Sequence, residues 1–208
     1  MITVSSNWLS LKSKGLDRVS KSIQKVNPTR NYVPASARKV KTSQYVGLDC
    51  EMVEGVSVEH MLARVSIVDF EGRVLYDAYV KPREEVKDFR THITGITKEI
   101  LKRRGESFKI VRDKVVELLK DKIVVGHAVH HDFEALDIPQ PSAGCLRDTC
   151  VFPALRPPNR KQTPSLRLLA EYWLDKTVQA GSHSSIEDAR TAMFLFKRFR
   201  EDWEASLQ

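Results

Sequence analysis

The chain has 208 residues, of which 41% are hydrophobic and 29% charged, and its net charge is +7. This length suits one domain with a tail, and the hydrophobic content is enough for a buried core. The apolar runs are far shorter than the roughly 18 residues of a membrane span, and the first residues show no secretory signal. We therefore expect a soluble intracellular protein without a membrane segment.

The cysteine pattern argues against two kinds of covalent or metal scaffold. Cys50, Cys145 and Cys150 form no CxxC pair, and their number is odd. Neither a zinc site nor a disulfide framework is indicated by such a pattern. A reducing compartment fits these cysteines best.

The positive charge is concentrated at the start of the chain. Residues 1–43 hold nine Lys or Arg and one acid, a net charge of +8, which leaves residues 44–208 at −1. Their composition is that of a segment too polar to order itself, so we expect a disordered arm. It could serve as a solubilising tail, but its charge favours an arm that binds polyanions or directs nuclear import. The predicted division is a basic arm over 1–43 and a folded domain over 44–208.

The folded domain begins with predicted strands. Residues 44–50, 61–70 and 73–80 are rich in β-branched and aromatic residues. Glu71 and Gly72 lie between the last two strands and predict a tight hairpin. Three successive strands of this kind start a mixed sheet.

Helices and strands alternate in the rest of the domain. The apolar spacing predicts helices over 97–104, 108–121 and 130–136, and strands over 122–128 and 144–150. This order indicates a three-layer α/β domain with helices on both faces of a mixed central sheet.

Two further helices are predicted from their start signals. Thr163 and Pro164 have the N-cap and first-position pattern, before a helix that continues to residue 174. Ser184 and Glu187 have capping-box spacing at the start of the last helix.

Two acids interrupt the first strand. Asp49 and Glu51 flank Cys50, so alternation along a strand directs both carboxylates to the same face, with Cα atoms roughly 6.6 Å apart. Both could reach a common pair of ions at that distance. Alone, the pattern is equally well explained by an exposed strand end. In an interior, the charges would be costly unless they are paired or bound to a metal.

Two other acids and a histidine follow later in the chain. Asp132 comes directly after the strand predicted at 122–128, at the sheet edge where open α/β sheets bind ligands. Asp188 falls on the first turn of the last helix, and His183 precedes that helix. Each has an ordinary explanation by itself, since an acid at a helix start is also a favourable partner of the helix dipole.

In combination, these residues show a resemblance. Their order is that of the DnaQ-like 3′→5′ exonucleases of the DEDD subclass with histidine, and within them of the branch that contains the interferon-induced RNA exonuclease and RNA exonuclease 4. The resemblance covers roughly residues 44–200. It is carried by "DCEMV", "LARVSIV", "VLYDAYVKP", "FRTHITGI", "VVGHAVHHDF", "RDTCVF" and "SHSSIEDARTAMFLF".

The resemblance implies a fold and a catalytic set. The fold would be a three-layer α/β/α RNase H-like fold. By similarity to the family, two divalent cations, Mg²⁺ or Mn²⁺, would be held by four carboxylates, and a histidine would act as the general base. These five predicted catalytic residues are Asp49, Glu51, Asp132, Asp188 and His183. Met52 and Arg90 are the candidate substrate-binding residues, both with ordinary packing or solvation as the alternative.

The chemistry explains why such a family needs these residue types. Two divalent cations activate a water, neutralise phosphate charge and stabilise the leaving oxygen. Mg²⁺ prefers carboxylate oxygens and keeps several waters, so a few acids from separate elements suit it. Imidazole titrates near neutrality and can take the proton of the attacking water.

The predicted function follows from the resemblance. We expect an RNA-degrading 3′→5′ exonuclease that releases nucleoside 5′-monophosphates and processes ribosomal-RNA precursors in the nucleus, in particular the nucleolus. RNA is the expected partner, with pre-ribosomal particles as a further one, and the protein is expected to be a monomer. The alternatives are an exonuclease for single-stranded DNA and a non-catalytic RNA-binding assembly factor. Retention of all five residues argues against the last.

Some features stand beside this prediction. The segment 54–60 is shorter than in relatives, and its acids, Glu54 and Glu59, would lie near a polyanionic substrate. Asp148 is expected to have a structural role, such as bonding to backbone amides. The three histidines at 127, 130 and 131 are not expected to be metal ligands.

Overall fold

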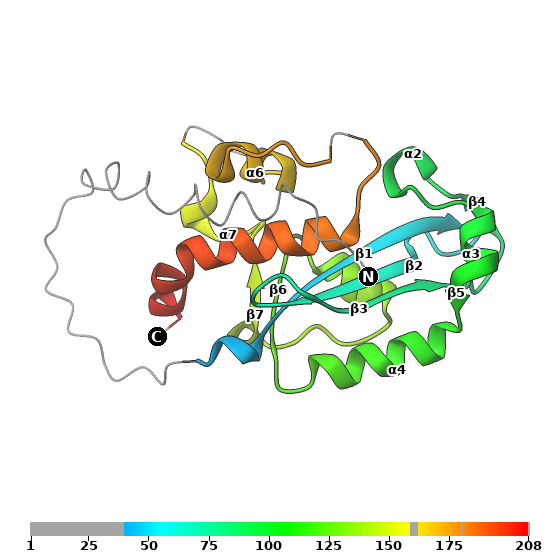
Figure 1. Cartoon of the computed structure of the whole chain (residues 1–208), viewed down its shortest axis with the longest axis horizontal. Helices are drawn as coiled ribbons and strands as arrows, with labels where there is room; N and C mark the ends of the chain where they lie inside the picture. The colour runs from blue at the N-terminus through cyan, green and yellow to red at the C-terminus, as the bar shows by residue number, and fades with distance from the viewer. Residues whose placement is uncertain (1–39, 159–161, 180, 208) are drawn as a thin grey trace, which may run out of the picture. The chain divides into compact units, whose positions relative to one another are not determined.

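The computed structural model describes residues 40–158, 162–179 and 181–207 (Figure 1). The basic arm predicted over 1–43 lies almost wholly outside these residues, so its disorder stays a prediction. The structure does describe its last positions, of which the final two belong to a short 3₁₀ helix, η3 (Thr42–Gln44). From Lys41 on, the described residues form one compact unit.

The centre of this unit is a mixed sheet of seven strands. The path of neighbouring strands is β5-β3-β2-β1-β6-β7, and β4 pairs with β1 outside this path. β1 is antiparallel to β2 and β4, and parallel to β6, which is itself parallel to β7. The predicted mixed sheet is therefore confirmed. The strands are β1 (Tyr45–Gly55), β2 (Met61–Asp69), β3 (Val74–Val80), β4 (Val86–Asp88), β5 (Gly105–Glu106), β6 (Ile123–Gly126) and β7 (Leu146–Asp148).

Helices cover both faces of the sheet, as predicted for three layers. The long helix α7 crosses β1, β2 and β6 on one face, and α6 packs on α7. Helices α4 and α5 pack beneath the other face. The helices are α2 (Thr91–Thr94), α3 (Lys98–Arg104), α4 (Phe108–Leu119), α5 (His130–Ala135), α6 (Leu166–Leu174) and α7 (Ser185–Ser206), with 3₁₀ turns η4 (Ala143–Cys145) and η5 (Pro153–Leu155).

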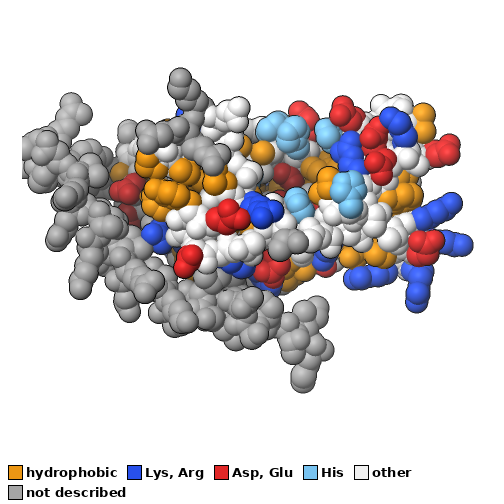
Figure 2. Space-filling view, turned by 90° about the horizontal axis from the view of Figure 1, so that it is seen from above, with side chains coloured by type: hydrophobic (Ala, Val, Ile, Leu, Met, Phe, Trp, Pro, Cys, Tyr) orange, Lys and Arg blue, Asp and Glu red, His pale blue; other side chains and the backbone are white. Residues whose placement is uncertain are grey.

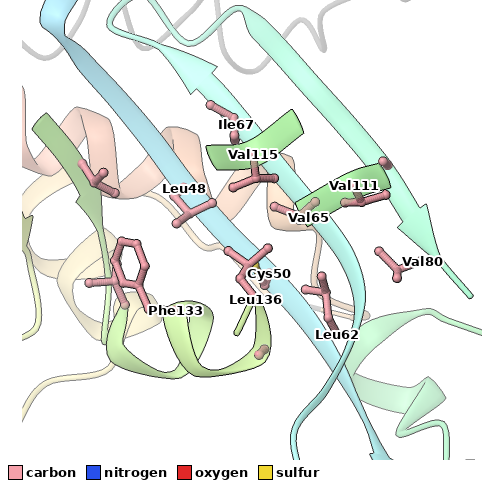
Figure 3. Packing of buried hydrophobic residues seen from close by; sticks show 14 of the residues in the cluster. Leu48, Cys50, Leu62, Val65, Ile67, Val80, Val111, Val115, Phe133 and Leu136 are labelled. Atoms are coloured by element: carbon pink, nitrogen blue, oxygen red, sulfur yellow. The ribbon is translucent and has the colours of Figure 1, made fainter. Parts of the chain in front are cut away.

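The main core lies between the sheet and α4 and α5 (Figure 3). Leu48 and Cys50 enter it from alternate positions of β1, and both are buried. Burial of each large aliphatic side chain contributes about 1.5–3 kcal/mol, so this layer fixes the position of β1. The partners of these two side chains include Val65, Ile67, Val111, Val115, Phe133 and Leu136.

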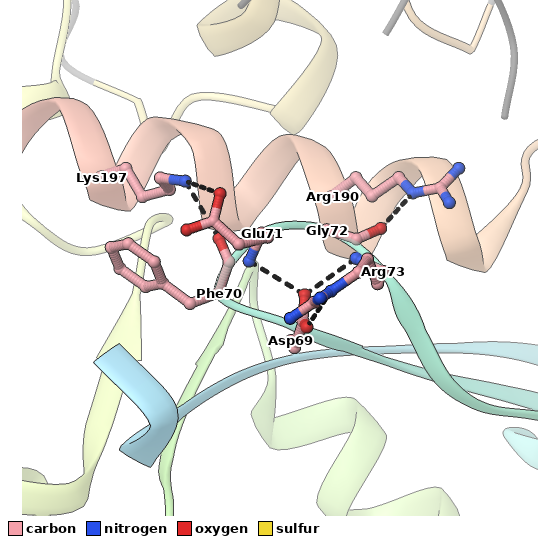
Figure 4. A network of polar contacts seen from close by, with 7 residues as sticks. All are labelled: Asp69, Phe70, Glu71, Gly72, Arg73, Arg190 and Lys197. Atoms are coloured by element: carbon pink, nitrogen blue, oxygen red, sulfur yellow. Dashed lines mark hydrogen bonds and ion pairs between the residues drawn. The ribbon is translucent and has the colours of Figure 1, made fainter. Parts of the chain in front are cut away.

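The predicted hairpin between β2 and β3 is confirmed (Figure 4). Gly72 has a φ of 79°, which a glycine adopts without a steric cost. The Asp69 Oδ1 atom accepts hydrogen bonds from the amides of Glu71 and Arg73, both at 2.9 Å. Arg190 of α7 donates to the Gly72 carbonyl at 2.8 Å, so the hairpin is attached to the helix above it.

Three short elements were not predicted. They are β4, α2 and β5, all within residues 86–106. Their lengths are too small to show a periodicity, and side-chain contacts stabilise them instead. Thr94, for example, donates to the carbonyl of Phe89 at 3.0 Å, and its hydroxyl also accepts from the Ile96 amide.

The predicted cap of α6 is wrong, whereas the predicted start of α7 is confirmed without its capping bonds. Helix α6 is capped by Ser165, whose hydroxyl accepts from the Leu168 amide at 3.3 Å, so Thr163 is not the cap. Ser184 is the N-cap residue of α7, but its side chain makes no capping bond. Glu187 instead forms an ion pair at 2.7 Å with Arg190, three residues further along the same helix.

Helix α7 continues to Ser206. Its last turns are held by Arg147, which is 2% exposed and forms two 2.8 Å bonds with the carboxylate of Glu204. Among the described residues, no helix has both the length and the apolar character to cross a membrane.

Candidate active site

The first two acids lie on the sheet face covered by α7. Asp49 pairs with Ser66 and Glu51 pairs with Arg64 in the antiparallel ladder of β1 and β2. The strand continues through both acids to Gly55, and the register shifts only after Glu51. The prediction that the two side chains share one face is consistent with this regular alternation. Leu48 and Cys50, in contrast, belong to the core on the opposite face.

Asp132 approaches the same part of β1 from the start of α5. Strand β6 pairs with β1 only as far as Gly47, so the edge of β1 beyond that residue is open to α5. The Asp132 carboxylate accepts from the amide and the thiol of Cys50 and is 4% exposed. Cys50 is therefore more than a packing residue, because its thiol also bonds to a candidate catalytic acid.

Asp148 fixes the turn that leads to Asp132. Its carboxylate accepts from the amides of Ala128 at 2.8 Å, Val129 at 3.1 Å and Cys150 at 2.9 Å. Ala128 has a φ of 54°, a conformation that a non-glycine residue adopts only when its surroundings hold it. The predicted structural role of Asp148 is confirmed, and it stabilises the start of α5.

Asp188 comes from the first turn of α7 and is 4% exposed. Its Oδ2 atom accepts a 2.9 Å hydrogen bond from the side-chain amide of Gln179. The same oxygen lies 3.8 Å from Nδ1 of His183. Gln179 was not predicted, because nothing in the sequence indicates that the segment before α7 returns to this acid.

His183 is held by its backbone, while its side chain is 32% exposed. Its amide donates to the carbonyl of Ile93 in α2. Gly95, which ends α2 with a φ of 66°, lies so close to Ser182 that an added Cβ would come within 3.3 Å of it. Helix α2 therefore positions the segment that carries the predicted general base.

The four acids share one electrostatic environment. Burial, followed by the charges of Asp132, Asp188 and Glu51, raises the pKa of Asp49 well above its usual value. Burial and the charge of Asp188 raise the pKa of Glu51 to about 8, and burial raises that of Asp132 to about 7. The pKa of Asp188 is also raised by burial. Figure 2 shows acidic side chains recessed in a hollow, with histidines around it.

The donor chemistry of these acids fits hard divalent cations. Glu51 is 5% exposed, and its Oε1 atom is buried without a hydrogen-bond partner, which is costly unless a cation approaches it. Carboxylate oxygens are the ligands that Mg²⁺ and Mn²⁺ prefer. Across residues 40–158, 162–179 and 181–207, however, no three Asp, Glu, His or Cys side chains are arranged to hold one ion. The acids therefore fit in chemistry but do not form a finished cage.

A polar network on β2 and β3 supports the acids and was not predicted. Arg64 binds Asp77 through two bonds of 2.8 and 3.0 Å, and Ser66 donates to the same carboxylate at 2.8 Å. The Ser66 hydroxyl also bonds to that of Ser185, at 2.7 Å, where α7 begins. Arg64 and Ser66 alternate in "LARVSIV" as the acids do in "LDCEM", and this spacing was the available signal.

The two predicted substrate-binding residues lie in different surroundings. Met52 is partly buried and packs against the core beneath the sheet. Arg90 has a φ of 48° and is 23% exposed, and its guanidinium lies 3.4 Å from Glu54 Oε2 and 3.3 Å from His60 Nδ1. Contact of either residue with a substrate stays a prediction.

The short segment after the acids is less acidic in effect than its sequence indicates. Glu54 belongs to β1, and Lys87 and Arg90 both donate to its carboxylate. Glu84 reaches across from the next loop and accepts from the amides of Ser57 and Val58. Two cations therefore neutralise the charge of Glu54, and its position near a substrate stays a prediction. Glu59 is exposed.

The RNase_T exonuclease model matches residues 46–196. The chain belongs to this exonuclease family, and its fold is RNase H-like.

Individual relatives and solved structures resemble this chain more specifically than the family model does. RNA exonuclease 4 of Candida glabrata is 42% identical over 79% of this chain and 63% of its own length. The mouse protein of that name is 44% identical over 77% of this chain and 37% of its own length. Against the first relatives matched, the chain spans from about half to about two thirds of their length. The Saccharomyces cerevisiae Pan2 module in complex with AAGGAA RNA superposes with a TM-score of 0.68 and 29% identity over 85% of this chain and 32% of that one.

Proposed function

We propose that this chain is a metal-dependent 3′→5′ exoribonuclease that releases nucleoside 5′-monophosphates. The observation that carries the proposal is the set of four buried carboxylates from β1, α5 and α7, in which burial and the charges of the other acids raise the pKa of Asp49 and of Glu51. A protein gains nothing in stability from such crowding, and active sites are where it is found. Relatives named RNA exonuclease 4 and the RNA-bound Pan2 neighbours support RNA as the substrate.

The residues of the site have separate tasks in this proposal. Asp49, Glu51, Asp132 and Asp188 would hold two divalent cations, which supply an activated water and charge stabilisation at the phosphate. His183 would take the proton from the attacking water, because an imidazole nitrogen is the most common general base in enzymes. Its neighbour Asp188 stabilises the resulting imidazolium from 3.8 Å. Helix α2 keeps the histidine beside the acids through the Ile93 carbonyl.

We extend the proposal to the cell with the support of the relatives' names and the charge distribution. Processing of ribosomal-RNA precursors in the nucleolus is the proposed role, and Mg²⁺ or Mn²⁺ is the proposed metal. The basic arm over residues 1–43 would supply salt-sensitive affinity for RNA phosphates. Its deletion should weaken RNA binding and reduce the salt dependence of that binding.

The test digests 3′-labelled and 5′-labelled RNA in Mg²⁺, Mn²⁺ or EDTA. We expect single nucleotides from the 3′ end, only with metal. Asp132→Asn and His183→Ala should each lower the rate by about 10³-fold or more while RNA binding persists. Asp202→Asn and His92→Ala are matched controls, because both residues are exposed. Unchanged activity in either site variant would reject the mechanism. Faster digestion of a matched DNA would assign the activity to single-stranded DNA instead.

A further inference from the structure

Three histidine rings meet beside the candidate active site. The ring centroids of His130 and His131 are 3.9 Å apart, and those of His60 and His131 are 5.5 Å apart. His60 comes from the loop between β1 and β2, whereas the other two begin α5. We refer to His60, His130 and His131 as the histidine rim.

The shortened loop delivers His60 to this position. Glu84 binds the amides of Ser57 and Val58, and the Gly55 amide donates to the Val58 carbonyl at 2.8 Å. These bonds hold the loop in a tight turn, and His60 at its end lies next to His131 of α5. The loop thereby places an aromatic ring beside the site where the sequence alone indicated acids.

Arg90 supports the rim from a third segment. Its Nη1 atom lies 3.3 Å from His60 Nδ1, and its amide donates to Asp88 Oδ1 at 2.7 Å. Glu54 takes part of the guanidinium charge. The rim is thus built from the loop between β1 and β2 and from the start of α5, and Arg90 contacts it from the segment before α2.

The surroundings of the rim exclude two simple explanations. The side chain of His131 is 49% exposed, His130 is exposed too and His60 is partly exposed, so none of the three is a core residue. Over the described part of the chain, these histidines do not form a site for a metal ion with any third ligand. What remains available is the aromatic surface of the rings, directly beside the buried Asp132.

We propose that the histidine rim stacks on a nucleobase near the 3′ end of the RNA. The inference rests on the proposed function, because it takes RNA as the molecule that reaches Asp132. Stacking on aromatic side chains is how proteins bind unpaired bases, and it tolerates any sequence because every base has a π-face. The rim would therefore favour an unpaired 3′ end without selecting its sequence.

The test is a binding cycle between the protein and the base. His60→Ala and His60→Phe are compared in the full chain, with fluorescent single-stranded RNA, EDTA to prevent hydrolysis, and about 0.3 M salt to suppress phosphate contacts. The same proteins are also tested with a series of RNAs, each of which lacks the base at a single one of the last positions before the 3′ end. We expect His60→Ala to raise Kd about tenfold on intact RNA and His60→Phe to have little effect. On the RNA that lacks the stacked base, wild type and His60→Ala should bind equally.

Two outcomes would overturn the inference. If His60→Phe loses as much affinity as His60→Ala, His60 acts through its contact with Arg90 and not by stacking. If the loss is the same on every abasic RNA, no base is stacked. His130→Ala provides a second variant should His60→Ala fail to fold, with circular dichroism as the check. A wild-type chain that binds RNA in this pattern but does not cleave it would reject the proposed function and leave the rim in place.

Discussion

The two faces of β1 differ in what they contribute. Leu48 and Cys50 point into an apolar layer with α4 and α5, where burial stabilises the fold. Asp49 and Glu51 point to the face under α7, where burial and mutual repulsion raise their pKa values and destabilise the ionised protein. The apolar face therefore stabilises the fold, and this stabilisation offsets the cost of the crowded carboxylates on the other face. A strand fixed this firmly on one side can hold like charges together on the other.

Substitutions on the two faces of β1 should separate activity from stability. Asp49→Asn removes one of the crowded charges, so we expect activity to fall by about 10³-fold or more without loss of stability. Labelled-RNA digestion and urea denaturation measure the two effects. A fully active Asp49→Asn protein would contradict the assigned role of this face.

The apolar face should respond in the opposite way. Leu48→Ala leaves a cavity between β1 and the helices below it, and should lower the free energy of unfolding by about 2–5 kcal/mol. Activity per folded molecule should be much less affected, as measured below the unfolding transition. Ile110→Ala is a suitable control, because Ile110 is 61% exposed.

The raised pKa of Glu51 predicts how stability depends on pH without metal. Because the folded protein binds this proton more tightly, its contribution is favourable at low pH and is lost as the pH rises from about 4.5 to about 8. At about 1.4 kcal/mol per pKa unit, the effect is a few kcal/mol. Urea denaturation in EDTA across this range should therefore show less pH dependence for Glu51→Gln than for wild type. Equal slopes would mean that Glu51 is ionised freely in the fold.

The smallest expected effect concerns the supporting network. Ser66→Ala removes the link between Asp77 and Ser185, and should cost about 1–3 kcal/mol because it leaves buried polar groups unpaired. A decrease in kcat without a change in KM would indicate that the link positions Asp49 and α7. Ser142→Ala is an exposed control. No change in either stability or rate would show that water replaces the hydroxyl.

Several elements could be predicted because their signals are local. The strands of β1 to β3, the Gly72 hairpin and helices α3 and α4 follow from alternation, helical periodicity and turn residues. Caps were less predictable, because Thr163 and Ser165 are both residue types that cap helices and they lie only two positions apart. The short elements within residues 86–106 could not be predicted, since they depend on side-chain hydrogen bonds such as that from Thr94 to the Phe89 carbonyl.

The candidate active site also has features that local sequence signals predicted and features that they did not. By itself, the sequence determined the types of residue: four acids, a histidine and their order, which the resemblance connected with one chemistry. Only the tertiary structure decided their surroundings, namely that Cys50 bonds to Asp132, that Gln179 reaches Asp188 and that Lys87 and Arg90 neutralise Glu54. The physical reason is that hydrogen bonds and charge pairs join residues far apart in the chain, where no spacing rule applies.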